Sequence, residues 1–289
     1  MKTANSSAME KKEYIRHFIS LIFLYSFLVI LALVFLLPVY GVLTTALRSN
    51  SEIIKEGFWA FPAPPSLENF VSIFEGGKIQ LFLLNTVVVT VPATLLSIGM
   101  GVLAGYAFGK LVFRYDLLLF ILIIAGMYIP PHVVLIPIYI FFNKLGMLDT
   151  LYSIIVVHVG FGIPICTMVM TNFFKSLPNE LRDVGMIDGC NDWQIMGRIM
   201  LPVSQAALVA LAILQFTWIW NDFIWPLVLI KTEAHMTIQL GVLQLRGQYG
   251  LAWGTQAAAY FMATLPTLIF FLLLQKHFVH GMTFGAVKE

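Results

Sequence analysis

Long apolar stretches alternate with short polar ones along the chain. A helix needs about 20 consecutive apolar residues to cross the hydrocarbon core of a membrane. Six stretches meet this length, and we expect one transmembrane helix in each: residues 18–43, 82–109, 117–142, 151–174, 203–230 and 257–274. Several are longer than a perpendicular helix requires, which predicts tilt or interfacial ends. The pattern therefore predicts an all-α, polytopic membrane protein with six transmembrane helices.

Composition supports insertion into a membrane. The 289 residues are 59% hydrophobic and 11% charged, whereas soluble domains are about half apolar and a quarter charged. A net charge of +2 gives no indication of nucleic-acid binding. We interpret Cys166 and Cys190 as unpaired thiols, and the six histidines are too scattered to predict a metal site. The first apolar stretch is too long for a signal peptide and no small-residue cleavage site follows, so we expect a retained anchor.

Basic residues predict the orientation of the six helices, because cytoplasmic loops carry an excess of Lys and Arg. Eleven lie on the side of the termini, and the other side has six: Arg48, Lys55, Lys78, Lys144, Lys231 and Arg246. Both termini are therefore expected in the cytoplasm. The predicted organisation is a cytoplasmic N-terminal segment 1–17, a transmembrane domain 18–275 with an extracytoplasmic loop 231–256, and a cytoplasmic tail 276–289.

Prolines inside the predicted helices favour a transport function. Each frees a carbonyl that lipid cannot satisfy, so the helix must contact protein or line a wet cavity. Such broken helices are typical of transporters, although prolines also shape purely structural bundles. The residues are Pro92, Pro130, Pro131, Pro137, Pro164 and Pro266. Glycines 99, 101 and 105 are expected to let the second helix approach a neighbour closely.

The segment "ELRDVGMIDGCNDW" (180–193) is unusually charged, with five charged residues in fourteen. Ser176 is predicted to cap a first helix, and Gly189 suits a left-handed helix end. Asn191 and Gln194 have the spacing of a capping box, which predicts a second helix closed by Pro202. Residues 175–202 are thus expected to form a cytoplasmic helix-turn-helix. From the residues alone, it is either a connector or a docking element for a partner.

Several motifs carry a resemblance to a known family. Asp183-Val184-Gly185, Asp188-Gly189 and Pro202 resemble the EAA coupling loop of ABC importer permeases, with Asp183 in place of the family's Glu. The stretches "NFFKSLPNEL", "WNDFIWPLVLI", "LRGQYGLAWG" and "FVHGMTFGAVK" resemble the carbohydrate-uptake branch, and are similar to the six-helix second permease subunit of the maltose transporter. The resemblance implies an ABC type I importer fold in a bacterial or archaeal cytoplasmic membrane.

The resemblance also implies partners. They are a second permease subunit in a heterodimer, a cytoplasmic ABC ATPase dimer that binds ATP and Mg, and an extracytoplasmic sugar-binding protein. The residues implied for ATPase coupling are Glu180, Asp183, Val184, Gly185, Asp188 and Gly189, and those for ATPase contact by the tail are Gly281, Gly285 and Ala286. The loop implied to contact the binding protein holds Gly247, Gln248, Tyr249 and Gly250. No cofactor is expected in this chain, and neither Gly-Lys pair fits a phosphate loop, so we do not expect an enzyme.

Four polar and aromatic residues of the fifth helix fall near one face and are candidates for lining the pathway: Gln215, Trp218, Asp222 and Trp225. The alternative is that Asp222 is satisfied by neighbouring groups and that the tryptophans lie at the membrane interface. His132 and His158 are interpreted as packing residues, and Asn85 as a polar link between helices.

The leading hypothesis is a permease subunit of an ATP-driven sugar importer. A permease for glycerol phosphate is the alternative substrate class, but the absence of Lys and Arg from the helix cores favours a neutral saccharide. An ion-coupled secondary carrier predicts several buried acids, and the predicted helices hold Asp222 alone. A membrane-embedded enzyme predicts a catalytic cluster, which the sequence does not indicate.

Overall fold

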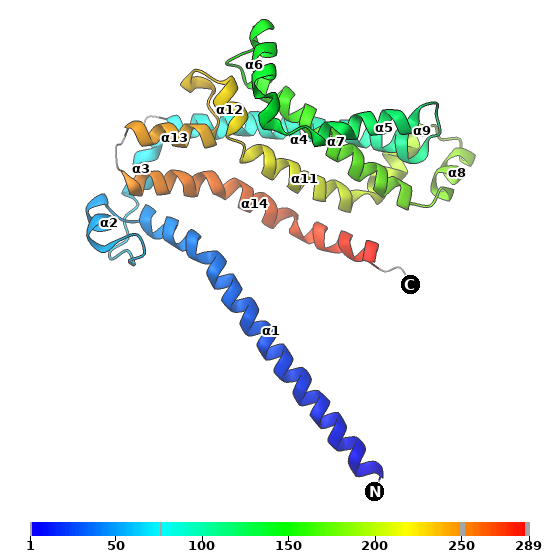
Figure 1. The fold of residues 1–289 in the computed structure, drawn as a ribbon, viewed down its shortest axis with the longest axis horizontal. Coiled ribbons are helices and arrows are strands. Elements are labelled where there is room, and N and C mark those ends of the chain that lie inside the picture. The colour runs from blue at the N-terminus through cyan, green and yellow to red at the C-terminus, as the bar shows by residue number, and fades with distance from the viewer. Residues whose placement is uncertain (1, 76, 249–251, 287–289) are drawn as a thin grey trace. The chain divides into compact units, whose positions relative to one another are not determined.

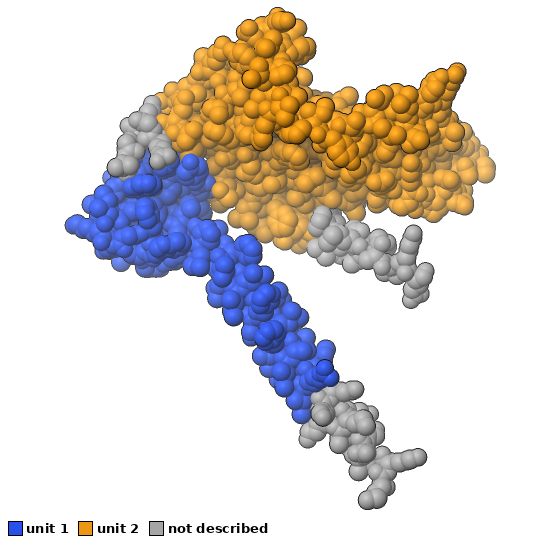
Figure 2. Space-filling model, viewed as in Figure 1, with its two compact units in different colours: residues 1–72, 251–261 blue, residues 73–250, 262–289 orange. Residues whose placement is uncertain are grey.

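The computed structural model describes the backbone of residues 2–75, 77–248 and 252–286, and the side chains of 14–75, 77–244 and 252–276. All the regular elements in these ranges are helical (Figure 1). The chain divides into two compact units, which are residues 1–72 with 251–261 and residues 73–250 with 262–289 (Figure 2).

The first unit is dominated by α1 (Lys2–Ala46), whose segment Tyr14–Ala46 is long and apolar enough to cross a membrane. Its most apolar 18 residues have no buried member, so this helix offers its side chains to lipid or to another protein. The unit also holds α2 (Asn50–Glu56), most of α3 (Glu68–Phe74) and the start of α14 (Trp253–Ala286).

Side-chain to backbone hydrogen bonds shape the chain after α1. Ser49 and Glu52 form a capping box that begins α2. The Asn69 amide donates to the carbonyls of Ala46 at 2.9 Å and Arg48 at 2.8 Å. The first bond satisfies a carbonyl that the end of α1 leaves without a helical partner, and the second fixes the chain just after the helix.

The second unit contains the remaining helices, which run in the order α4 (Lys78–Lys110), α5 (Asp116–Ala125), η1 (Gly126–Tyr128), η2 (Pro131–Val134), α6 (Leu135–Lys144), α7 (Leu151–Ser176), α8 (Glu180–Ile187), α9 (Asp192–Ile195), the π-helix η3 (Met196–Met200), α10 (Leu201–Val203), α11 (Gln205–Trp220), α12 (Ile224–Leu229), η4 (Glu233–His235) and α13 (Ile238–Gln248). The rest of α14 completes it.

In the described parts, four helices are long and apolar enough to cross a membrane. If each of two bent helix pairs counts as one span, there are up to six spans. The predicted third helix, 117–142, is not continuous: its two halves meet at 89°. Pro130 and Pro131 lie at this break, where missing amide donors prevent helical bonding.

The predicted fifth helix, 203–230, is also not continuous. The chain bends by 78° at Ser204, before α11, and helical structure stops again at residues 221–223. Asp222 accounts for the second break, because its carboxylate accepts from the amides of Ile224 at 3.1 Å and Trp225 at 3.2 Å. These bonds start α12 as a separate helix.

Helices α4 and α7 pack closely along a stripe of glycines. A Cβ added to any of three glycines on α4 would overlap the Cβ of a residue on α7; the pairs are Gly101 with Cys166, Gly105 with Met170, and Gly109 with Phe174. The close approach predicted for Gly101 and Gly105 is confirmed, and Gly109 extends the stripe beyond the predicted residues. The prediction for Gly99 was wrong, because a Cβ there would meet open space. Small residues at this spacing join α4 and α7 into one body.

Candidate functional site

The charged segment forms a short hairpin of two helices, α8 and α9, which we call the α8–α9 hairpin (residues 180–195). Gly189 has φ +81°, the left-handed conformation predicted for this joint. The capping box is also confirmed: Asn191 Oδ1 accepts from the Gln194 amide, and Gln194 Oε1 accepts from the Asn191 amide, both at 3.0 Å.

The start of the hairpin differs from the prediction. Ser176 is the last residue of α7, and its hydroxyl donates to the Phe173 carbonyl at 2.7 Å, so it does not cap α8. Helix α8 begins after Asn179 instead, whose side-chain oxygen accepts from Lys110 Nζ at 2.9 Å. The α7 helix continues two residues beyond the predicted end at 174, and this extension takes Ser176 out of the capping position.

The two helices of the hairpin contact each other through Gly185, which is buried. A Cβ added there would lie 2.9 Å from Ile195 Cγ1 and 3.1 Å from Ile199 Cδ1. A larger residue would separate the helices, so this position needs a residue without a side chain.

The outward face of α8 combines acids with apolar side chains. Glu180, Asp183 and Asp188 are exposed, as are Val184 (56%) and Ile187 (84%). Exposed apolar groups beside charges are typical of protein-interaction surfaces. Five of the six residues predicted for ATPase coupling therefore lie on the surface of the hairpin, and the sixth, Gly185, lies under it.

Asp192 connects the hairpin to α4. Its carboxylate accepts from Arg182 Nε at 2.9 Å and Nη2 at 3.3 Å, and from the Tyr106 hydroxyl at 2.8 Å. We call Tyr106, Arg182 and Asp192 the Asp192 cluster. The hydrogen bonds from Arg182 to Asp192 raise the pKa of the guanidinium above its usual value. No short sequence pattern marks this cluster, because the partners on α4 and α9 are 86 residues apart.

The four pathway candidates are placed differently from one another. Gln215 is buried against α7, with its amide 3.5 Å from the Gly162 carbonyl, and the Trp225 ring packs 5.6 Å from the Phe161 ring. Trp218 is 59% exposed. Asp222 Oδ2 lies 3.3 Å from His158 Nε2, and both side chains are largely buried. Trp218 is therefore the most exposed of the four side chains.

The other polar residues singled out in the spans have distinct places. His158 is buried and paired with Asp222, whereas His132 is exposed at the break between α5 and α6. Asn85 donates to the carbonyls of Ala234 and Met236, both at 2.9 Å, and so holds η4 and the residue after it rather than a second long helix. The adjacent Thr86 hydroxyl accepts from the Ile238 amide at 2.7 Å, at the start of α13.

At the end of the second unit opposite the hairpin (Figure 1), a carboxylate fixes the loop between α12 and α13. Asp149 Oδ1 accepts from the amides of Lys231 and Thr232 at 2.9 Å and from the Thr232 hydroxyl at 3.1 Å. The Asp149 amide donates to the Leu229 carbonyl at 2.8 Å. We call Asp149, Leu229, Lys231 and Thr232 the Asp149 cluster. Partial burial raises the pKa of the Asp149 carboxyl, but the hydrogen bonds from Thr232 and Lys231 outweigh it and lower this pKa to about 2.

Two further groups of predicted residues lie at the limits of the described chain. Gly247 and Gln248 end α13, and Tyr249 and Gly250 fall outside the described residues. Gly281, Gly285 and Ala286 belong to the last turns of α14, so the predicted tail is helical as far as Ala286.

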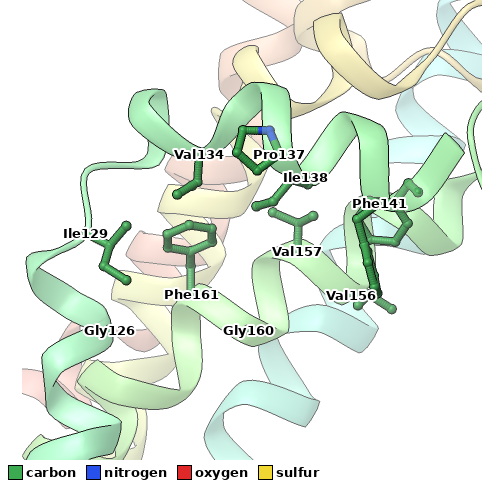
Figure 3. A pocket seen from close by; sticks show the side chains of 11 residues that line it. Gly126, Ile129, Val134, Pro137, Ile138, Phe141, Val156, Val157, Gly160 and Phe161 are labelled. Carbon is green, nitrogen blue, oxygen red and sulfur yellow. The ribbon is translucent and has the colours of Figure 1, made fainter. Parts of the chain in front are cut away.

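A cavity of about 540 Å³ lies between the two halves of the bent α5–α6 pair and α7 (Figure 3). Its lining includes Ile129, Pro137, Val157 and Phe161, which point into the space. Every side chain that lines it is apolar. A saccharide needs hydrogen-bond partners for its hydroxyls, and the side chains of this cavity offer none.

These features define a multi-span helical membrane protein with a short hairpin that presents acids and apolar groups. Residues 97–284 match the family described as the binding-protein-dependent transport system inner membrane component, and the chain belongs to that family. This membership confirms the resemblance found in the sequence. It disfavours the ion-coupled carrier and the membrane-embedded enzyme, because the family consists of membrane components that depend on a binding protein.

Individual relatives agree with this family. A protein of Caldicellulosiruptor sp. (strain Rt8B.4), named as an ABC transporter permease protein, is 33% identical over 262 residues, which cover 91% of this chain and 95% of the relative. The arabinooligosaccharides transport system permease protein AraQ of Bacillus subtilis (strain 168) is 29% identical and covers 91% and 94%. A bacterial ABC transporter involved in the import of the acidic polysaccharide alginate shares the fold, with a TM-score of 0.79, 21% identity and coverage of 89% and 95%.

Proposed function

We propose that this chain is the transmembrane permease subunit of an ATP-driven sugar importer, that it forms half of the translocation pathway and that it couples to a separate ATPase through the α8–α9 hairpin. The observation that carries the proposal is the exposed acidic and apolar face of α8, on a hairpin hydrogen-bonded to α4. Asp183 and Glu180 are the acids proposed to pair with basic residues of the ATPase, and Val184 and Ile187 the apolar contacts.

The proposed partners follow from the transport class. A cytoplasmic ABC ATPase dimer binds ATP and Mg, a second permease subunit completes the pathway, and an extracytoplasmic binding protein delivers the sugar. The family's dependence on a binding protein supports the last of these. The distribution of basic residues supports a cytoplasmic location for both termini and for the hairpin.

Two groups of residues are proposed to serve these partners. Gly247, Gln248, Tyr249 and Gly250 contact the binding protein, and Gly281, Gly285 and Ala286 contact the ATPase dimer. Gly247 and Gln248 lie at the end of α13, and this position supports the proposed contact with the binding protein. The start of the same helix is held against α4 by Asn85 and Thr86.

The proposed substrate is a neutral saccharide. AraQ, whose name assigns it to arabino-oligosaccharide transport, supports the saccharide class. Among the pathway candidates, Trp218 offers an exposed flat ring of the kind that stacks on sugars, while Gln215, Asp222 and Trp225 are proposed to support the wall behind it. No Lys or Arg belongs to this group, which makes glycerol phosphate the less favoured alternative.

Reconstituted transport tests the function. The permease, its partner permease, its ATPase and its binding protein are placed in liposomes, and uptake is measured with a neutral oligosaccharide, an alginate oligosaccharide and glycerol phosphate. We expect ATP-dependent uptake of the neutral oligosaccharide. Uptake that follows an ion gradient without ATP would contradict the proposal, and uptake of glycerol phosphate alone would correct the substrate.

Replacing Asp188 and Gly189 together by leucine tests the hairpin's role. The pair forms the joint of the hairpin, and leucine cannot adopt the left-handed conformation of Gly189 without strain. We expect normal insertion with loss of ATP-driven uptake. Unchanged uptake in this variant would remove the hairpin from the coupling pathway.

A further inference from the structure

Helix α8 is attached to the rest of the second unit by apolar packing of Leu181 and Gly185 and by a small number of polar bonds. The chain enters it through residues 177–179 and leaves it through the Gly189 joint, and neither connection is helical. Arg182 joins α8 to Asp192 on α9 by two hydrogen bonds. Tyr106 joins the same carboxylate to α4, so one side chain connects three helices.

A second attachment lies one turn further along α4. Lys110 Nζ donates to the Leu177 carbonyl at 2.6 Å and to Asn179 Oδ1 at 2.9 Å. Residues 106 and 110 share a face of the helix because they are four positions apart. Lys110 therefore holds the entry to α8. Tyr106 holds the first half of α8 through Asp192 and Arg182.

The face of α4 that carries Tyr106 is itself fixed inside the bundle. Tyr106 is only 4% exposed, and its ring packs edge-on against Phe174 of α7 with the centroids 5.9 Å apart. The glycine stripe holds the same two helices together over the preceding turns. A displacement of α8 that keeps the Asp192 cluster intact must therefore move α4 and α7 with it.

We propose that the Asp192 cluster transmits movement of the α8–α9 hairpin to α4, with Tyr106 and Asp192 as positioning residues for coupled transport. This inference rests on the proposed ATPase-coupling role of the hairpin. The Arg182 and Asp192 side chains keep 25% and 38% of their surface exposed, so water can replace their bonds and the cluster can re-form in each transport cycle. The Tyr106 side chain is almost fully buried, and its hydroxyl holds the carboxylate on the side of α4.

The test uses the complete reconstituted importer, and it measures sugar transported per ATP hydrolysed. Tyr106→Phe removes one hydroxyl and keeps the ring that packs on Phe174. We expect the amount of assembled complex to be unchanged and the transport-to-hydrolysis ratio to fall about tenfold, which corresponds to about 1.4 kcal/mol of lost coupling. Tyr115→Phe is the matched control, because Tyr115 is an exposed tyrosine at the same end of the bundle whose ring lies under Arg114. Its ratio should equal that of the original protein.

A double-mutant comparison separates transmission from general destabilisation. Asp192→Ala should lower the ratio, and adding Tyr106→Phe should lower it little further, because each change removes the bond between the Tyr106 hydroxyl and the Asp192 carboxylate. Asp192→Glu, which keeps the charge, should restore part of the ratio. Additive losses, or a lower yield of complex with an unchanged ratio, would overturn the proposal. If the original importer transports without ATP, the proposed function fails; if it is ATP-coupled and Tyr106→Phe matches it, only the transmission role fails.

Discussion

The two ends of the second unit are held by carboxylates that are used in different ways. Asp149 accepts from two backbone amides and from the Thr232 hydroxyl, with His235 Nδ1 3.5 Å from the carboxylate, and it fixes one loop in one shape. Asp192 accepts only from side chains, and these come from two other helices. Backbone partners define a local conformation, whereas side-chain partners allow whole helices to separate and rejoin. The Asp149 end is a loop held in one shape, and the side-chain bonds at the hairpin end fit the proposed transmission of movement.

Removing the Asp149 carboxylate should have the largest effect on stability. Asp149→Ala leaves the amides of Lys231 and Thr232 without their acceptor, and we expect a loss of about 3 kcal/mol in the free energy of unfolding. Thermal unfolding of the purified protein measures it. Asp149→Asn is the control, since asparagine tolerates the positive φ of this position and keeps a neutral acceptor. Equal losses in both variants would show that the charge, rather than the acceptor, holds the loop.

Widening the hairpin should have the next largest effect. Gly185→Val places a side chain against Ile195 and Ile199, and overpacking of this kind costs about 1–3 kcal/mol. We expect a lower melting temperature and slower ATP-driven uptake. Gly197→Val adds the same residue type at a glycine with open space around its Cβ position, and it should have a much smaller effect. Similar behaviour of the two variants would contradict the packing seen between α8 and α9.

The pH dependence of the Asp149 cluster should be visible at acidic pH. The folded-state pKa of Asp149 is about 2, below the usual 3.8, so its contribution to stability is complete above pH 3.8 and is lost as the pH falls through about 2. Hydrogen exchange at the Lys231 and Thr232 amides measures this change. The protection of these two amides is corrected for their intrinsic exchange rates. If it stays constant from pH 5 to 2, the Asp149 carboxylate is not the acceptor that protects them.

The ion pair between Lys78 and Glu233 should contribute least. Its atoms are 2.6 Å apart, but the two side chains are 35% and 43% exposed, and exposed pairs contribute about 0–1 kcal/mol. Glu233→Gln should therefore change the melting temperature by at most a few degrees. A loss comparable to that of Asp149→Ala would mean that charge pairs, and not bonds to the backbone, hold this end.

Some local features were predictable from the sequence, whereas the partners in contacts between distant segments were not. The Gly189 joint and the Asn191 capping box depend on residues within four positions of one another, so their spacing was sufficient. The Asp149 and Asp192 clusters join residues 82 and 86 positions apart, and no short pattern marks such pairs. The prolines indicated breaks, but no sequence pattern gives the 89° angle between the two halves of the bent pair.

The central claim is that the α8–α9 hairpin contacts the ATPase, and cross-linking from Ile187 tests it most directly. Ile187 is 84% exposed on α8, and Tyr152, at 71%, is an equally accessible position at the start of α7. A photo-reactive residue is placed at one position or the other in the purified, reconstituted importer, which is then irradiated without nucleotide. The account predicts an adduct with the ATPase polypeptide from position 187 and none from position 152. The absence of an ATPase adduct from position 187 in an importer that still transports would contradict it.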